Sequence, residues 1–432
     1  MKVKVVVVGG GPAGFSAATT ARKAGAEVTV LERTDMLGGL GLVAGLSYSN
    51  YAYIPVTEAK ALGGAELYDV FESITIHSHV EGTPQGGWTK LYNVTRLDSA
   101  MQKAFRARGI EFMFGKRVVN IDMVGDKVSA VVCKDGTKIK GDVFIDTTGA
   151  TTGIEACERL GYGCVSCILR CPSFGNPGGI VEKKVKTVSA LNDYGKPTTI
   201  GTSVMIAIES VSPEIRRELR EKGFVAIPVP KDIEPDTDRF RRAASTHSGV
   251  ADMQGLKVNM LLHDIGGFAK VVGSASPMYA RSLRSFPGLE DAMIFHPGAG
   301  ARGHLVWQVA MAYRDNALRA DGFVNVFCAG TKCGPQHSLI DAAVTGDLAG
   351  HNAVRCGLGQ PGLELPKTLA IGAYINHVGK MMRTEDGLKN RYGVKVPELL
   401  KSLNVFRQDE KEIAREVEKT GLVGVYQAKL VQ

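Results

Sequence analysis

The chain opens with an apolar run, a glycine cluster, a helical pattern and a second apolar run. Residues 2–8 are rich in β-branched side chains, which is typical of a strand buried on both faces of a parallel sheet. Residues 12–23 follow a helical pattern that stops at Gly25, and residues 27–31 predict a second strand. Strand, helix and strand in this order predict a βαβ unit with parallel strands.

The turn between the first strand and the helix carries a Gly-x-Gly-x-x-Gly pattern at Gly9, Gly11 and Gly14. In such a turn the first glycine makes the tight bend, the second lets a pyrophosphate approach the backbone, and the third lets helix pack on strand. The helix N-terminus then faces the phosphates. Glu32 ends the second strand, where an acid accepts from ribose hydroxyls and disfavours a 2′-phosphorylated dinucleotide. The segment therefore predicts a dinucleotide site.

Strand patterns continue through the middle of the chain. Residues 118–133 predict a β-hairpin that turns at Gly125 and Asp126, and a second turn follows shortly after it. Residues 203–209 and 256–262 are also strand-like. A chain of this kind, with a βαβ unit and later strands, is expected to form an α/β protein of more than one domain.

Two further segments are helical by pattern. Ser212 is a favoured N-cap residue, Pro213 suits the first helical position, and Gly223 ends the helix. The tail from Pro366 onward also reads as helical. Its apolar residues at helical spacing are Leu399, Leu400, Leu403, Ile413 and Val417. This stripe predicts a surface that docks on the rest of the protein.

Charge and cysteine content add the setting. The chain has 52 glycines and a formal net charge of +8, with its basic residues dispersed rather than in runs. This balance allows a polyanionic partner such as tRNA without favouring one, because a nucleotide cofactor and anionic substrates also suit it. The first residues do not form a signal peptide, and no apolar stretch has the ~18 residues that a membrane span needs. We therefore expect a cytoplasmic protein with no membrane partner, whose eight cysteines are reduced.

Three later segments decide which dinucleotide is expected. Residues 33–39 end in Gly38-Gly39, residues 142–150 end a strand in a Thr-Gly turn, and residues 324–330 form a strand that ends in glycine. All three resemble FAD-binding proteins of the glutathione-reductase-like superfamily. The resemblance implies a doubly wound, Rossmann-like FAD domain. The residues expected to hold FAD are Gly9, Gly11, Pro12, Ala13, Gly14, Glu32, Arg33, Gly39, Thr148, Gly149, Gly330, Thr345 and Gly346.

The same resemblance suggests how the domains divide. Residues 1–175 and 283–358 would form the discontinuous FAD domain, and residues 176–282 an inserted α+β cap that covers the flavin and makes the substrate site. Residues 359–432 would be a short helical tail. After the closing strand, residues 338–354 predict a helix whose N-terminus points at the flavin, with His337 as a candidate proton donor or acceptor there.

Residues 282–292, 327–330 and 341–353 resemble the GidA family of folate-dependent flavoproteins that modify tRNA uridines. Members of that family carry a cysteine shortly after the first Gly-Gly turn and another before the segment that matches 282–292. Residues 40–50 and 251–281 of this chain contain no cysteine. The resemblance therefore implies the flavin chemistry of the family, while tRNA-uridine modification becomes the second hypothesis.

A cysteine cluster offers another redox group. Cys164, Cys167 and Cys171 stand in a C-x-x-C-x-x-x-C-P pattern that resembles a ferredoxin ligand run, and Cys157 or Cys333 is the candidate fourth ligand. Three interpretations stay open: an iron–sulfur cluster, a redox-active dithiol of Cys164 and Cys167, and structural or zinc-bound cysteines.

The sequence thus predicts an FAD-dependent oxidoreductase that acts on a small metabolite and couples its flavin to a cysteine-based centre. The alternatives are a GidA-type enzyme and an electron-relay subunit of a complex. NAD(P)H is a candidate electron donor, a redox protein is a candidate partner, and a homo-oligomer is an open expectation.

Overall fold

The structure is a computed structural model. It describes residues 2–49, 53–80, 89–149, 179–189, 191, 199–200, 204–233, 259–271, 282–296, 307–308, 310–334, 339–390 and 396–431.

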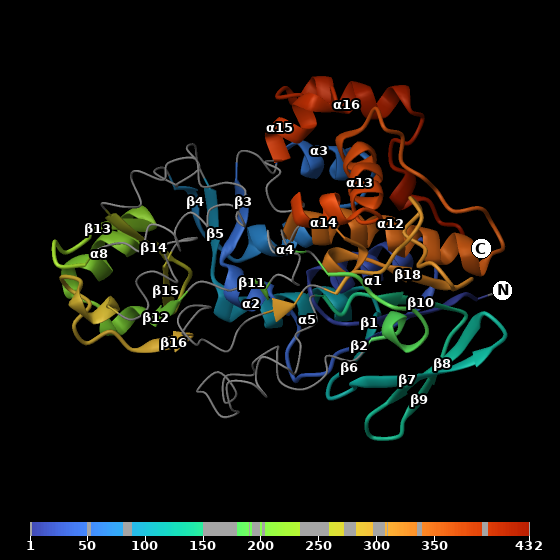
Figure 1. Cartoon of the computed structure of the whole chain (residues 1–432), viewed down its shortest axis with the longest axis horizontal. Helices are drawn as coiled ribbons and strands as arrows, with labels where there is room; N and C mark the ends of the chain where they lie inside the picture. The colour runs from blue at the N-terminus through green and yellow to red at the C-terminus, as the bar shows by residue number, and fades with distance from the viewer. Residues whose placement is uncertain are drawn as a thin grey trace.

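A parallel five-stranded sheet forms the centre of the protein (Figure 1). Its strands are β1 (Lys4–Val8), β2 (Glu27–Leu31), β6 (Glu111–Met113), β10 (Val143–Asp146) and β18 (Val326–Cys328). They lie in the order β18-β10-β1-β2-β6, and α1 (Pro12–Lys23) crosses from β1 to β2. Val5 and Val7 are fully buried and Val6 is 2% exposed, because both faces of the sheet are covered. The predicted βαβ unit and doubly wound sheet are confirmed.

The helix α12 (Leu339–Gly357) packs along α1 on one face of this sheet. Two of its glycines make the approach close: a Cβ on Gly346 would lie 2.5 Å from the Ala13 carbonyl oxygen, and one on Gly350 would lie 2.3 Å from that of Ala17. The predicted helix over 338–354 is therefore present and extends to Gly357.

An antiparallel three-stranded sheet follows β6. It consists of β7 (Val118–Val124), β8 (Lys127–Cys133) and β9 (Lys138–Lys140). Gly125 has φ +60° and Gly136 has φ +85°, so each turn contains the left-handed residue that glycine accepts at low cost. Both predicted turns are confirmed.

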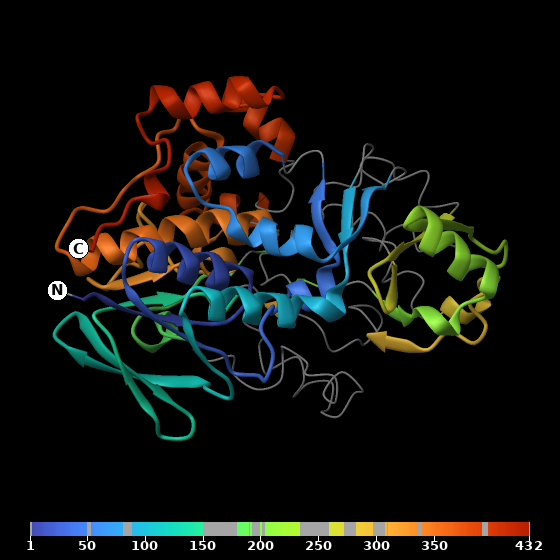
Figure 2. The same cartoon turned by 180° about the vertical axis from the view of Figure 1, so that it is seen from behind.

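A second three-stranded sheet stands between the central sheet and the cap (Figures 1 and 2). Its strands are β3 (Leu46–Ser49), β5 (Thr89–Tyr92) and β4 (Thr75–Val80). The same part of the chain forms the helices α2 (Gly41–Ala44), α3 (Tyr53–Ala61), α4 (Glu66–Ser73) and α5 (Leu97–Ala107).

The cap is built on an antiparallel sheet with its own core. Its order is β13 (Phe224–Pro228), β14 (Asn259–Asp264), β15 (Phe268–Val271), β12 (Met205–Ala207), β16 (Ile294–His296). The helix α8 (Pro213–Lys222) covers it and begins as predicted, with the Ser212 hydroxyl accepting from the Ile215 amide at 3.3 Å. A short two-stranded ladder, β11 (Thr199–Ile200) with β17 (Trp307–Gln308), completes the described sheets.

One boundary differs from the expectation. The sequence placed the return to the FAD domain at residue 283, but Leu283, Phe286, Leu289 and Ala292 are buried in the cap core. β16 then pairs with β12 of the cap sheet. These apolar side chains, which the resemblance assigned to the FAD domain, thus belong to the core of the cap.

The C-terminal segment is helical, as predicted. Its helices are α13 (Ala370–Met381), α14 (Glu385–Asn390), α15 (Val396–Ser402) and α16 (Glu410–Lys419). They gather over α3 at one side of the central sheet, far from the cap (Figures 1 and 2). Leu400, Ile413 and Val417 are at most 1% exposed, which confirms the docking surface. None of the described helices combines the length and apolar character that a membrane crossing requires.

Candidate functional site

The glycine turn after β1 has the geometry of a phosphate loop. Gly9 has φ +112°, and a Cβ there would lie 2.6 Å from the Thr147 carbonyl oxygen. A Cβ on Gly14 would lie 1.9 Å from the Gly9 carbonyl oxygen. Gly9 and Gly14 therefore allow the turn and the close packing of α1 on β1 that the pattern predicts.

Gly11 has a different environment. It is the N-cap residue of α1, and no side chain caps this helix terminus. Among the residues that the structure describes, a Cβ on Gly11 would have Gly39 Cα, at 3.9 Å, as its only neighbour within 4 Å. The turn at Gly38 and Gly39 thus lies across from Gly11 and the start of α1, and the described residues do not fill the position of a Gly11 side chain. An uncapped helix N-terminus with open backbone beside it fits the pyrophosphate of a dinucleotide.

Glu32 organises this loop from the end of β2. Its Oε2 accepts from the Gly10 amide at 2.8 Å, and its Oε1 accepts from the Thr34 amide and hydroxyl, each at 2.9 Å. A carboxylate has about four acceptor positions, so one remains for a ribose hydroxyl. Arg33, the next predicted contact, is half-buried.

Gly330 closes the site from the end of β18. It has φ +65°, and a Cβ there would meet the Ala13 methyl at 2.9 Å. Its amide donates to the Thr345 hydroxyl at 2.8 Å, and that hydroxyl donates to the Asp341 carbonyl oxygen at 2.5 Å. Thr345 and Gly346 are buried, so both stand behind the predicted site: Thr345 positions Gly330, and Gly346 lets α12 approach Ala13.

The Thr-Gly turn is fastened by Asp146 at the end of β10. Asp146 Oδ1 accepts from the Thr148 amide at 3.1 Å and hydroxyl at 2.7 Å. Its Oδ2 accepts from the amides of Ile180 and Val181 at 2.8 and 3.1 Å. The Asp146 carboxylate thus binds both Thr148 and the backbone at residues 180–181. A Cβ on Gly149 would meet no atom of the described residues within 4 Å.

A buried ion pair that the sequence did not reveal lies beside this carboxylate. Lys332 is fully buried and pairs with Glu182 of the short helix η2 (Val181–Lys183). Burial alone disfavours the ammonium, but Glu182 and Asp146 attract it and raise the pKa of Lys332. Cys333 follows directly, and its thiol donates to the Gly330 carbonyl oxygen at 3.1 Å.

The remaining cysteine and histidine calls lie outside the described residues. These are Cys157, Cys164, Cys167, Cys171 and His337. Among the residues that the structure describes, no group of three or more His, Cys, Asp or Glu side chains is arranged to hold a metal ion. Among the predicted ligands, Cys333 is described, and it ends the short helix η6 (Gly330–Cys333) that follows β18.

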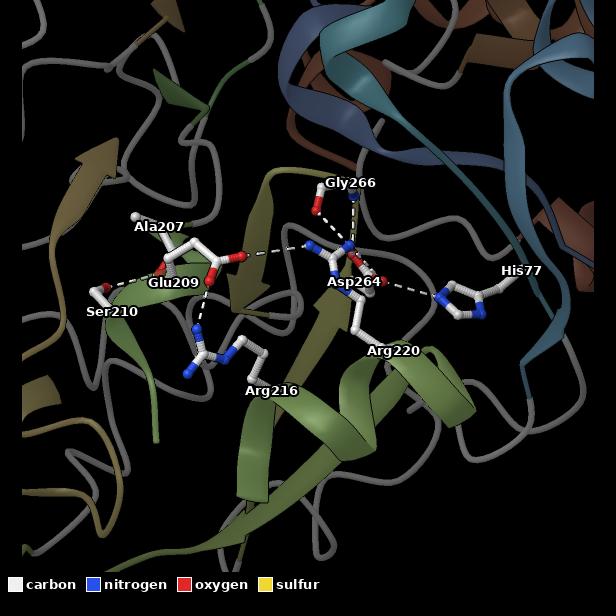
Figure 3. A network of polar contacts seen from close by, with 8 residues as sticks. All are labelled: His77, Ala207, Glu209, Ser210, Arg216, Arg220, Asp264 and Gly266. Carbon is white, nitrogen blue, oxygen red and sulfur yellow. Dashed lines mark hydrogen bonds and ion pairs between the residues drawn. The ribbon is translucent and has the colours of Figure 1, made fainter. Parts of the chain in front are cut away.

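The joint between the cap and the dinucleotide domain is a second polar cluster, which Figure 3 shows. Asp264, 1% exposed at the end of β14, contacts His77 Nε2 of β4 at 3.1 Å and the Arg220 guanidinium of α8 at 3.3 Å. Arg220 also donates to the Gly266 carbonyl oxygen at 2.9 Å. The neighbouring Ile265 accepts from the Val94 amide at 3.1 Å. The tip between β14 and β15 thus fixes the cap to the second sheet.

Comparisons with known proteins match the N-terminal third of the chain. Residues 4–154 match the family model described as FAD dependent oxidoreductase. The FAD-dependent monooxygenase atnJ of Arthrinium is 26% identical over 162 residues, which are 35% of this chain and 37% of that protein. Thiamine thiazole synthase of Aeropyrum pernix is 26% identical over 159 residues, 34% of this chain and 55% of that protein. The chain thus matches only part of the length of these relatives.

Solved structures extend the similarity to the whole fold. GidA of Aquifex aeolicus superimposes with a TM-score of 0.58 at 16% identity, covering 97% of this chain and 76% of that chain. A second crystal form of the same protein gives 0.55. The predicted fold class is confirmed.

Proposed function

We propose that the chain is an FAD-dependent oxidoreductase that acts on a small metabolite. The observation that carries the proposal is the uncapped start of α1 at Gly11, where Gly39 Cα is the one atom of the described residues within 4 Å of an added Cβ. This turn lies within the segment that matches the FAD-dependent family. Bound FAD would supply the two-electron chemistry, and the protein supplies binding, orientation and charge.

The described residues divide this work. Backbone amides at the start of α1 would bind the pyrophosphate, with the positive end of the helix dipole behind them. Glu32 would accept from a ribose hydroxyl while it keeps the Gly10 amide in place. Gly330, held by Thr345, would bring backbone close to the cofactor from β18.

We further propose a cysteine-based centre that exchanges electrons with the flavin. Its support is the spacing of Cys164, Cys167 and Cys171, together with the placement of Cys333 beside Gly330. Asp146 adds support, because it fastens the chain on both sides of the cysteine segment, at residue 148 and at 180–181, close to the same sheet edge. An iron–sulfur cluster is the first form of this centre and a dithiol the second. NAD(P)H or a redox protein is the proposed electron donor.

Elemental analysis of anaerobically purified protein tests this centre. An iron–sulfur cluster predicts iron and sulfide in similar amounts, and Cys167→Ser should remove both while FAD stays bound. The control is Cys356→Ser, a half-buried thiol on α12. Iron-free protein that takes up two electrons beyond the flavin would support the dithiol instead. Iron-free protein without that uptake would contradict both forms.

GidA-type modification of tRNA is the second candidate. The fold similarity to GidA and the net charge of +8 favour it, and the absence of cysteine from residues 40–50 and 251–281 disfavours it. A gel shift against total tRNA at two salt concentrations separates the candidates, because phosphate-driven binding weakens steeply with salt. We expect no shift at low salt. A salt-sensitive shift would favour the tRNA enzyme.

A further inference from the structure

The cap sheet has two faces with different partners. Ile206, Ala269 and Val271 are buried in the core of the cap. Their neighbours along the strands, Met205 and Phe268, pack instead against the core of the dinucleotide domain. Since side chains alternate along a strand, Lys270 of β15 stands on this second face, on the same side as Phe268.

Lys270 has a histidine beside it on the same face. Lys270 is in register with Met205 of β12 on one side and with His263 of β14 on the other. Residues paired in this way have their Cβ atoms about 4.5–5.5 Å apart. His263 is 1% exposed, and among the described residues its Nδ1 has no hydrogen-bond partner. A basic side chain and an unpartnered buried ring nitrogen thus stand side by side.

The Lys270 ammonium reaches across the joint. Its Nζ donates to the carbonyl oxygen of Ala44 at 2.5 Å. Ala44 ends α2, the helix that begins directly after the turn at Gly38 and Gly39. The amine is therefore held next to the segment that leads away from the predicted pyrophosphate cradle.

The charge of Lys270 is not balanced by the described protein. No carboxylate of the described residues lies within 4.0 Å of its Nζ, whereas the Arg220 guanidinium of the same cap lies 3.3 Å from the Asp264 carboxylate. Burial lowers the pKa of Lys270 to about 8. Burial, with Lys270 and His77 as neighbouring positive charges, lowers the pKa of His263 to about 3. A half-buried ammonium without a carboxylate partner binds an anion favourably, because the anion supplies the missing counter-charge.

We propose that Lys270, with His263 beside it, is the anchor for the anionic group of the substrate, a carboxylate or a phosphate, between the cap sheet and the segment that follows Gly39. This inference rests on the proposed function, since it names the substrate class of the same site. Lys270 binds the anionic oxygen directly. His263 orients Lys270 from the adjacent strand and supplies a further hydrogen-bonding nitrogen.

Anion titration of the FAD-loaded protein tests the anchor. Benzoate and inorganic phosphate are titrated separately, and binding is followed through the perturbation of the flavin absorption. We expect saturable binding of at least one anion, weakened at least about tenfold in Lys270→Met and retained in Lys270→Arg. The anion that binds distinguishes a carboxylate site from a phosphate site. Lys222→Met is the matched control, because Lys222 lies on the exposed side of α8 and pairs with Glu218.

Three results would overturn the anchor while leaving the flavoprotein intact. Wild-type holoprotein that responds to neither anion is one. Lys270→Met protein that binds the anion as tightly as wild type is another. The third is a loss of FAD affinity in Lys270→Met as large as the loss of anion affinity, which would assign the amine to the cofactor. If Lys270→Met does not fold, Lys270→Gln, which keeps a donor for the Ala44 carbonyl, takes its place. Failure of FAD binding in wild type would instead refute the proposed function.

Discussion

Replacing Gly11 with alanine should leave the fold intact and weaken FAD binding. Gly11 has φ −79° and ψ −173°, an extended conformation that alanine adopts without strain. Its Cβ would have a single neighbour among the described residues, Gly39 Cα at 3.9 Å. Losing glycine at an N-cap costs roughly 0.5–1 kcal/mol, while restricting the unfolded chain gains about 0.4–1 kcal/mol. The two effects offset each other, so the free energy of unfolding of the apoprotein should change little.

The same methyl group should lower the affinity for FAD. At Gly11 the methyl would project into the space that the protein leaves open for a pyrophosphate. Forcing an extra methyl into a well-packed contact costs about 1–3 kcal/mol, which corresponds to roughly a 5- to 150-fold rise in the dissociation constant of FAD. Titration of apoprotein with FAD, followed by flavin fluorescence, measures this change.

Gly14 provides the matched control. A Cβ there would lie 1.9 Å from the Gly9 carbonyl oxygen and 2.9 Å from the Thr147 hydroxyl, so α1 must move away from β1. Gly14→Ala should therefore destabilise the apoprotein by about 3 kcal/mol or more, with or without FAD. Stable Gly11→Ala apoprotein that binds FAD as tightly as wild type would refute the placement of the pyrophosphate at Gly11.

Three other changes test separate parts of the structure. Thr345→Val leaves the buried amide of Gly330 unpaired, so the free energy of unfolding should fall by about 1–3 kcal/mol. An unchanged melting temperature would contradict the role of Thr345 in holding Gly330. Burial raises the pKa of Glu58 from 4.5 to about 7. Between these pH values the folded protein binds more protons than the unfolded chain, so its free energy of unfolding falls by up to about 3 kcal/mol as pH rises. In denaturant titrations at several pH values, the free energy of unfolding of Glu58→Gln should fall less steeply with pH than that of wild type. An equally steep fall would refute the role of Glu58. Asp264→Asn and His77→Ala should show a coupling energy of about 0.5–3 kcal/mol in a double-mutant cycle, and simple additivity would rule out their contact.

Local patterns were enough to predict the dinucleotide-binding unit. Strand, glycine turn and helix are encoded by neighbouring residues, so the roles of Gly9 and Gly14 followed from spacing alone. The hairpin at Gly125 and the helix after Ser212 were predicted for the same reason, since a turn or cap depends on the few residues that form it.

Contacts between distant segments were not predictable in this way. Asp264 meets His77 across 187 residues of sequence, and Lys332 meets Glu182 across 150. The pattern of apolar and polar residues around these positions does not predict which distant residue each one contacts. Thr345 shows the related limit: its place in the FAD motif suggested contact with the cofactor, whereas its hydroxyl is used to hold Gly330.

The flavin content of the purified protein tests the central claim most directly. The account predicts yellow protein with the two visible absorption bands of oxidised flavin and one FAD released per chain on denaturation. Apoprotein should regain both bands when FAD is added. Colourless protein that binds no added FAD, with its secondary structure intact by circular dichroism, would contradict the assignment of the β1–α1 turn as an FAD site.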